Sequence, residues 1–87
     1  MVKIDKKTWP EHFEKILNGK KKFDLRLDDF KCNIGDIIVL KEFNPKTKKY
    51  TGRVIEKEVT YVLKTKDISF WTEKEIKENG LQILSLK

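Results

Sequence analysis

Four apolar residues in a row, Ile37 to Leu40, constrain the fold of this chain more than any other stretch. Successive side chains of a β-strand point to opposite faces, so a strand with this sequence needs cover on both sides. The chain has 87 residues, and a domain of this size buries only about 60 to 65% of the surface that its unfolded chain exposes. We therefore expect a single domain, residues 1–87, with a small core around this strand.

A helix is predicted directly after Thr8. Thr8 and Glu11 have the spacing of a capping box, and Pro10 falls in the first turn, where its missing N–H costs nothing. Gly19 suits the left-handed position that ends a helix. The apolar residues at helical spacing, which we expect to pack in the core, are Trp9, Phe13, Ile16 and Leu17.

Two further stretches have the pattern of strands. From Lys22 to Leu27 apolar and charged residues alternate, which places Asp24 and Arg26 on one charged face. Arg53 to Leu63 is rich in Val, Ile, Thr and Tyr. It follows a loop at residues 44–49, so it is expected to form a long hairpin with Ile37–Leu40.

The C-terminal third predicts shorter elements. Strands are expected over Ile68–Trp71 and Leu81–Leu86, with a brief helix between them. That helix begins at the capping-box pair Thr72 and Glu75 and ends at Gly80. Because strands outnumber helices and the connections are short, the pattern predicts an α+β fold, a small, mostly antiparallel β-barrel with one or two flanking helices.

The charge balance favours an anionic partner. The net charge is +6 and the pI about 9.4, and a basic protein attracts phosphate or carboxylate groups. Acidic residues are interspersed almost everywhere, however, and a surface rich in Lys and Glu is also typical of thermophilic proteins. No apolar run could span a bilayer or serve as a secretion signal, and Cys32 is a lone cysteine. These features predict a cytoplasmic protein with no membrane partner; the sequence leaves the oligomeric state open, with a monomer favoured.

The residues from Gly19 to Arg26 are the first candidate for a ligand site. Gly19 lets the backbone turn sharply, so that Lys20, Lys21 and Lys22 would lie at the lip of the barrel, where ammonium groups can meet phosphates. Arg26 offers a planar fork of donors. Asp24 could hold that fork, or accept from an exocyclic amine as carboxylates do with cytosine. The alternative is a solvated ion-pair face.

A second candidate lies in the predicted hairpin. Lys48 and Lys49 in its loop, with Tyr50 beside them and Arg53 further along, could clamp a nucleic-acid backbone and stack a base. The alternative is a solvated loop. Phe70 and Trp71 are adjacent, so we expect one ring to cap the core and the other to face outward.

Neither a metal site nor a cofactor is expected. One histidine, His12, and one cysteine cannot build the usual zinc site, and we place His12 on the surface. Cys32 has no evident base to activate it as a nucleophile.

The first 63 residues resemble the ASCH superfamily, and most closely a small single-domain subgroup of unknown function. The resemblance implies a PUA-like β-barrel that acts on RNA or nucleotide-like ligands, with a cleft lined by Gly19, Lys21, Asp24 and Arg26. Lys22 stands where the family usually has a threonine or serine, and Asp24 where it usually has a glutamate. The residues that carry the resemblance are Trp9-Pro10, Phe13, Ile16-Leu17, Gly19, Lys21, Asp24, Arg26, Asp29 and Gly35-Asp36.

Two functions from different classes follow. The first is an RNA-binding or nucleotide-binding module with a basic cleft where the helix meets the following strand. The alternative is an amidohydrolase acting on acetylated cytidine or a related nucleoside, as one ASCH branch does. Its candidate catalytic residues are Lys21, Asp24, Glu73 and Glu75. A protein-binding or toxin–antitoxin module is a third possibility.

Overall fold

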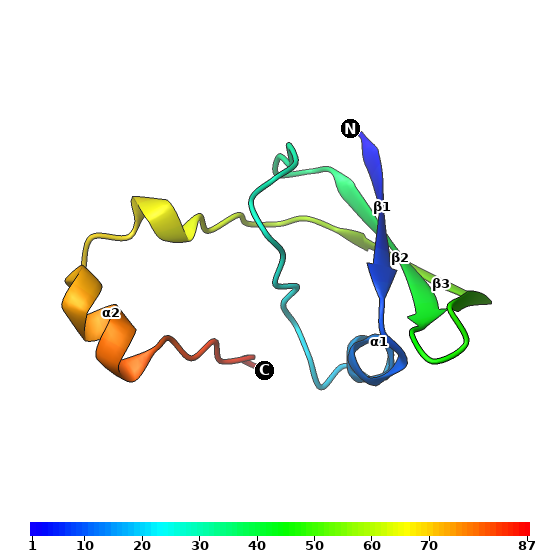
Figure 1. Ribbon diagram of the computed structural model, residues 1–87. Helices are drawn as coiled ribbons and strands as arrows, with labels where there is room; N and C mark the ends of the chain where they lie inside the picture. Colours follow the sequence, from blue (N-terminus) through cyan, green and yellow to red (C-terminus); the bar gives the residue numbers. More distant parts are fainter.

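The computed structural model describes residues 1–87, and its central feature is an open three-stranded sheet (Figure 1). The strand order is β1-β2-β3; β1 runs parallel to β2, and β3 is antiparallel to it. A helix follows the first strand, and a short 3₁₀ turn and a second helix follow the sheet. The elements are β1 (Lys3–Thr8), α1 (Pro10–Leu17), β2 (Ile37–Asn44), β3 (Lys49–Glu58), the 3₁₀ turn Thr65–Asp67 and α2 (Glu73–Asn79).

Strand β2 lies in the centre of the sheet and has buried side chains on both faces, as its sequence predicts. On the inner face Ile38 and Leu40 are buried in the core. On the outer face Val39 is buried as well, although no helix covers it. The register places Val39 between Asp5 and Glu56, and two cross-strand ion pairs join the three strands on this face. These pairs are Lys3–Glu56 at 3.0 Å and Lys41–Asp5 at 2.9 Å.

Helix α1 supplies the other half of the core. Phe13, only 1% exposed, and Ile16 pack against Ile38 and Leu40. The remaining apolar residues of the predicted stripe are not buried, because the short helix turns only one narrow face to the sheet. The prediction that Trp9 and Leu17 pack in the core is therefore wrong: Trp9 is 57% exposed and Leu17 is exposed as well.

The ends of α1 differ in how well the sequence predicts them. The N-cap is Trp9, and its side chain makes no cap hydrogen bond. Thr8, the predicted cap, instead ends β1 opposite Glu42 and is buried, because β1 extends to it. At the other end Gly19 has a φ of 80°, so the predicted glycine stop is confirmed. Here the Lys21 N–H donates to the carbonyl of Lys15 at 2.9 Å.

The predicted barrel is wrong, because the sheet does not close. β1 and β3 are both edge strands, and the strands expected over Lys22–Leu27, Ile68–Trp71 and Leu81–Leu86 are absent. β3 is paired from Lys49 and ends at Glu58, so residues 59–63 lie outside it. Parallel pairing of β1 with β2 also replaces part of the expected antiparallel order. The stretch 22–27 has strand-like alternation, but no N–H from Phe23 to Lys31 donates to a backbone carbonyl.

The second helix forms as predicted but lies away from the sheet (Figure 1). Thr72 caps α2, with both halves of the capping box present, and Gly80 follows its last residue. Phe70 and Trp71 pack edge to face on each other, with ring centroids 5.6 Å apart, and both are exposed. The prediction that one of them caps the core is wrong, since the 3₁₀ turn carries this segment away from the strands. Neither helix has the length and apolar character needed to cross a membrane.

Candidate functional site

A cavity of about 900 Å³ opens beside the core. Its floor is apolar and includes Ile16, Ile38 and Leu40. One wall is the segment from Lys21 to Asp28, which follows helix α1, and the other is the segment from Lys57 to Thr65, at and beyond the end of β3. The volume lies within the roughly 300 to 1,000 Å³ of ligand pockets. Of the first candidate set, Gly19, Lys21, Lys22, Asp24 and Arg26 all line this cavity, whereas Lys20 does not.

Arg26 and Asp24 form a fixed pair in the first wall. Nε of Arg26 donates to Asp24 at 2.8 Å, and the guanidinium also donates to the carbonyl of Lys7 at 2.8 Å and to the hydroxyl of Thr8 at 3.0 Å. Both side chains are about one-quarter exposed. Arg26 therefore joins the wall to the end of β1, with most of its donors occupied. Asp24 retains lone pairs that can accept further hydrogen bonds.

The lysines of the cavity differ in their partners. The Lys21 ammonium lies 3.4 Å from Nδ1 of His12 and 5.1 Å from the centre of the Phe23 ring. The Lys22 backbone N–H donates to the Ser85 hydroxyl at 2.8 Å, but its ammonium has no acidic partner, nor has that of Lys57 in the opposite wall. The unpaired cations thus lie on both walls.

Aromatic rings and one further ion pair complete the walls. Phe23 comes from the first wall, and Tyr61, which is exposed, from the second. Lys64 of the second wall reaches across to Asp28 of the first, at 3.1 Å. The cavity therefore combines free ammonium groups, ring surfaces and a carboxylate held in place by a guanidinium, which together can bind a charged group and a planar ring.

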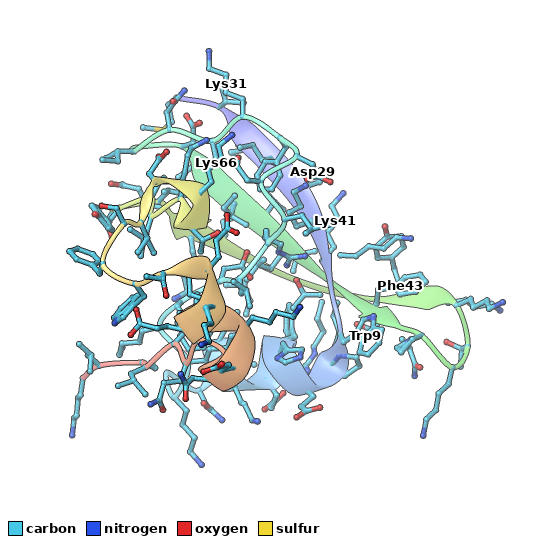
Figure 2. The ribbon with its side chains drawn as sticks, turned by 60° about the vertical axis from the view of Figure 1, so that its left-hand side comes forward. Trp9, Asp29, Lys31, Lys41, Phe43 and Lys66 are labelled. Atoms are coloured by element: carbon cyan, nitrogen blue, oxygen red, sulfur yellow. The ribbon has the colours of Figure 1, made fainter.

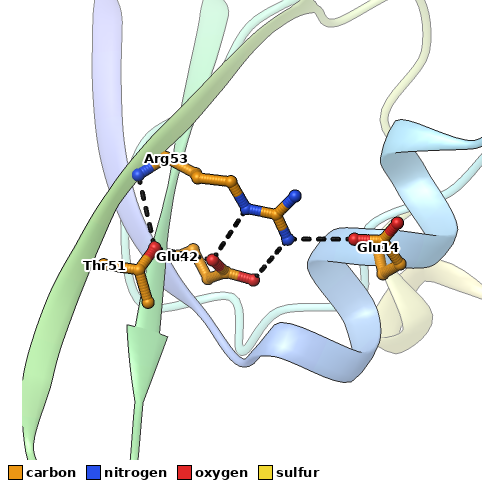
Figure 3. Close-up of polar contacts among 4 residues, drawn as sticks. All are labelled: Glu14, Glu42, Thr51 and Arg53. Atoms are coloured by element: carbon orange, nitrogen blue, oxygen red, sulfur yellow. Dashed lines mark hydrogen bonds and ion pairs between the residues drawn. The ribbon is translucent and has the colours of Figure 1, made fainter.

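Arg53 lies outside the cavity, in a separate network on the inner face of the sheet (Figure 3). A bulge at Gly52, whose φ is 94°, directs both Thr51 and Arg53 towards Glu42. Glu42 accepts from Arg53 Nε at 2.9 Å and from the Thr51 hydroxyl at 2.6 Å, and Arg53 also reaches Glu14 of α1 at 2.9 Å. The hydrogen bonds from Arg53 and Thr51 lower the pKa of Glu42 to about 2, and Glu42 and Glu14 raise the pKa of Arg53. This network fastens α1 to the hairpin.

Two other groups are structural, one buried and one half-buried. Asp36 is buried, and it accepts from the backbone N–H groups of Asn33 at 2.9 Å and Val2 at 3.1 Å. These bonds lower the pKa of Asp36 and fasten the turn before β2 to the N-terminus. Burial raises the pKa of the Cys32 thiol, with the neighbouring Asp36 charge acting in the same direction.

The remaining hairpin candidates lie at the far end of the sheet and do not line the cavity. Lys48 has a φ of 57° in the tight loop, and Lys49 begins β3. Tyr50 packs edge to face on Phe43, with ring centroids 5.1 Å apart. The two groups of candidates therefore form two separate places on the molecule.

The residues named for amide hydrolysis are not brought together. Lys21 and Asp24 line the cavity, but Glu73 and Glu75 do not. Glu75 accepts from the backbone and hydroxyl of Thr72 in the capping box, at 3.0 and 3.1 Å. Glu73 lies exposed in the first turn of α2.

A family model covers most of this structure. It matches residues 5–79 and is described as a domain of unknown function, DUF3850. The chain belongs to this family. The match includes the sheet except the first two residues of β1, together with both walls of the cavity and α2, so the cavity lies within the DUF3850 domain. No curated protein and no solved structure matches the chain. The resemblance to the ASCH superfamily stays a prediction.

Sequence reasoning missed part of this DUF3850 cavity. Lys57 and Tyr61 lie in the stretch predicted as a strand and Lys64 directly follows it, but the sequence gives no signal that the end of that stretch faces Lys21 to Asp28. The partner of Arg53 was missed as well. Glu42 is a lone acid that follows the apolar strand two residues after Leu40, and period-two alternation places it on the core face. That spacing is a usable signal for a buried carboxylate with a cationic partner.

Proposed function

We propose that this DUF3850 domain binds nucleotides, free or within RNA, in the cavity between residues 21–28 and 57–65. One observation carries the proposal: unpaired ammonium groups, aromatic rings and a fixed carboxylate line the same concave surface. Lys22 and Lys57, on opposite walls, would contact phosphates, with the strong dependence on salt that such contacts have. Phe23 and Tyr61 offer ring faces for a base.

The fixed carboxylate gives the proposal a chemical preference. Arg26 holds Asp24 at 2.8 Å and is itself fixed to Lys7 and Thr8. A carboxylate only accepts hydrogen bonds, so it favours a base edge that carries an exocyclic amine, as in cytosine, over one that presents a carbonyl, as in uracil. We therefore expect cytidine monophosphate to bind more tightly than uridine monophosphate.

Amide chemical shifts provide the test. Cytidine monophosphate at low salt should perturb the amides of residues 19–26 and 57–64, with weaker binding as salt is added. The double variant Lys22→Glu/Lys57→Glu should lose most of this affinity. Lys74→Glu in α2, which changes a highly exposed lysine away from the sheet, should bind like the parent.

Two results would speak against the proposal. Unchanged spectra at millimolar nucleotide and low salt would refute the cavity as a nucleotide site. If the parent binds cytidine and uridine monophosphates with equal affinity, and Asp24→Asn changes neither affinity, the role given to Asp24 is refuted. The binding function is preferred to amide hydrolysis because Glu73 and Glu75 lie outside the cavity.

A further inference from the structure

A second surface of the molecule, at the hairpin end of the sheet, combines exposed rings with lysines. Phe43 and Tyr50 pack on each other here, and the ammonium of Lys7 lies 4.5 Å above the Phe43 ring. We call this surface the hairpin patch. Its rings and one lysine lie on the sheet face away from the core, where Phe43 pairs with Tyr50, and loop lysines border it; Lys49, paired with Asn44, projects towards the other face. The residues of the patch are Lys7, Trp9, Phe43, Lys46, Lys48, Lys49 and Tyr50.

The strand register brings Trp9 to the same place. Thr8 is paired with Glu42, so Trp9 comes level with Phe43 at the end of the parallel pair. Figure 2 shows both residues at the hairpin end of the sheet, far from Lys31 at the other end. Trp9 is 57% and Tyr50 53% exposed. The patch therefore presents large rings to solvent at the end of an uncovered sheet face.

Charge is distributed unevenly along the sheet, from its open end to the hairpin. The hairpin lysines Lys46, Lys48 and Lys49 have no acidic partner. Asp5, on the neighbouring strand, is already paired with Lys41 at 2.9 Å. The acidic residues of β3 lie opposite the start of β2, away from the hairpin; Glu58, for example, is the register partner of Ile37. The hairpin end is thus strongly cationic, and its natural complement is a polyanion.

We propose that the hairpin patch binds single-stranded nucleic acid, with bases stacked on the exposed rings and phosphates on the loop lysines. A duplex would offer the phosphates but not the ring faces, since its bases already stack on one another. The rings of the patch lie on the other side of the sheet from the cavity, and no residue of the patch lines the cavity, so this proposal goes beyond nucleotide binding there and does not depend on it.

Trp9 fluorescence provides the test. In the full chain carrying Trp71→Phe, Trp9 is the one tryptophan left, and a short oligouridylate should quench its emission. Lys46→Glu/Lys49→Glu should weaken binding and reduce the salt slope by about 1.4, at about 0.7 for each phosphate contact on a single strand. Lys74→Glu/Lys77→Glu makes the same charge change on α2 and should leave affinity nearly unaltered.

Stacking is tested separately. Tyr50→Leu keeps an apolar side chain against Phe43 but removes the ring face, so oligouridylate should bind at least about 5-fold more weakly, the lower range for a lost stack. Urea denaturation checks that this variant folds. Cytidine monophosphate titrations of the cavity should be unaffected by any hairpin variant.

Several outcomes would overturn the proposal. The first is that oligouridylate leaves the emission of Trp9 unquenched. The second is that the Lys46→Glu/Lys49→Glu variant and the α2 variant bind oligouridylate equally well. The third is that duplex RNA binds as tightly as the single strand and that Tyr50→Leu does not weaken binding. Quenching by polyglutamate at the same concentrations would assign the patch to an acidic protein instead. Loss of cytidine monophosphate binding with oligouridylate binding intact would refute the cavity and leave the patch standing.

Discussion

Replacing Glu42 with glutamine should cost this domain more stability than any other isosteric change on its sheet. Glu42 is only 4% exposed and accepts hydrogen bonds from both Arg53 and Thr51. Those bonds lower its pKa from the ordinary 4.5 to about 2. One unit of pKa corresponds to about 1.4 kcal/mol, so this lowering of the pKa corresponds to roughly 3 kcal/mol of folding free energy.

The expected loss at neutral pH is smaller than this figure, at about 2 kcal/mol. Arg53 is about half exposed, so water screens part of the interaction. Glutamine also keeps one carbonyl to accept from Arg53. For a domain of this size, about 2 kcal/mol lowers the melting temperature by roughly 8 to 16 °C. Urea and thermal denaturation of Glu42→Gln against the parent measure both quantities.

The pH dependence gives the sharper test. Because the folded-state pKa of Glu42 lies below the unfolded value, its contribution is complete above about 4.5 and is lost as pH falls towards about 2. The gap in stability between parent and Glu42→Gln should therefore narrow across that window. Glu56→Gln is the matched control, since Glu56 pairs with Lys3 on the exposed face, and should cost at most about 1 kcal/mol. A Glu42→Gln loss no larger than the control, or a gap that does not change with pH, would refute the reasoning.

Three further substitutions test other parts of the fold. Arg26→Ala should destabilise the domain by about 2 kcal/mol, because it removes the hydrogen bonds that join the cavity wall to β1; a loss under about 0.5 kcal/mol in urea would show that the wall is held otherwise. Gly52→Ala should cost about 1 to 2 kcal/mol because its φ is 94°, although no atom lies within 4 Å of the added carbon; an unaltered urea midpoint would contradict this. Thr72→Ala should lower the hydrogen-exchange protection of α2 by about 1 kcal/mol while leaving the sheet amides unaltered, and equal loss in both would mean that α2 unfolds together with the sheet.

Local signals predicted the parts of the fold that depend on neighbouring residues. Ile37–Leu40 forms a strand buried on both faces, because four apolar residues in a row have few other solutions. Gly19 ends α1 in a left-handed conformation, and Thr72 and Glu75 form their capping box. Each of these features needs only a few residues along the chain.

Pairing between distant segments was predicted less well. β1 has one apolar residue facing the core, Ile4, and its neighbour on that face is the charged Lys6, so its sequence hardly indicates a strand. The stretch 22–27 shows the reverse case. Its alternation describes an extended backbone, but Arg26 fastens it through side-chain bonds rather than a ladder. Period-two alternation predicts which side chains share a face, and not whether another strand lies beside them.

The candidate site was also predicted only in part: the residues that local structure positions were found, and those that a distant segment supplies were not. Lys21, Asp24 and Arg26 line a concave surface, as the sequence suggested, because helix α1 and its glycine stop place them locally. Lys57 and Tyr61 reach that surface only through the course of the chain after β3, which no short-range pattern encodes. Whether the cavity takes a nucleotide stays a prediction.

Each wall of the cavity contains a stretch without backbone ladder hydrogen bonds, and this affects how the specificity of the cavity can be mapped. From Phe23 to Lys31 no amide hydrogen donates to a backbone carbonyl, and the same holds from Thr60 to Leu63. Main-chain groups of both stretches are thus available to a bound molecule, and a carbonyl or amide cannot be removed by exchanging side chains. An alanine scan would therefore undercount the contacts of this site, and backbone-directed probes such as amide-to-ester replacement would reveal the remainder.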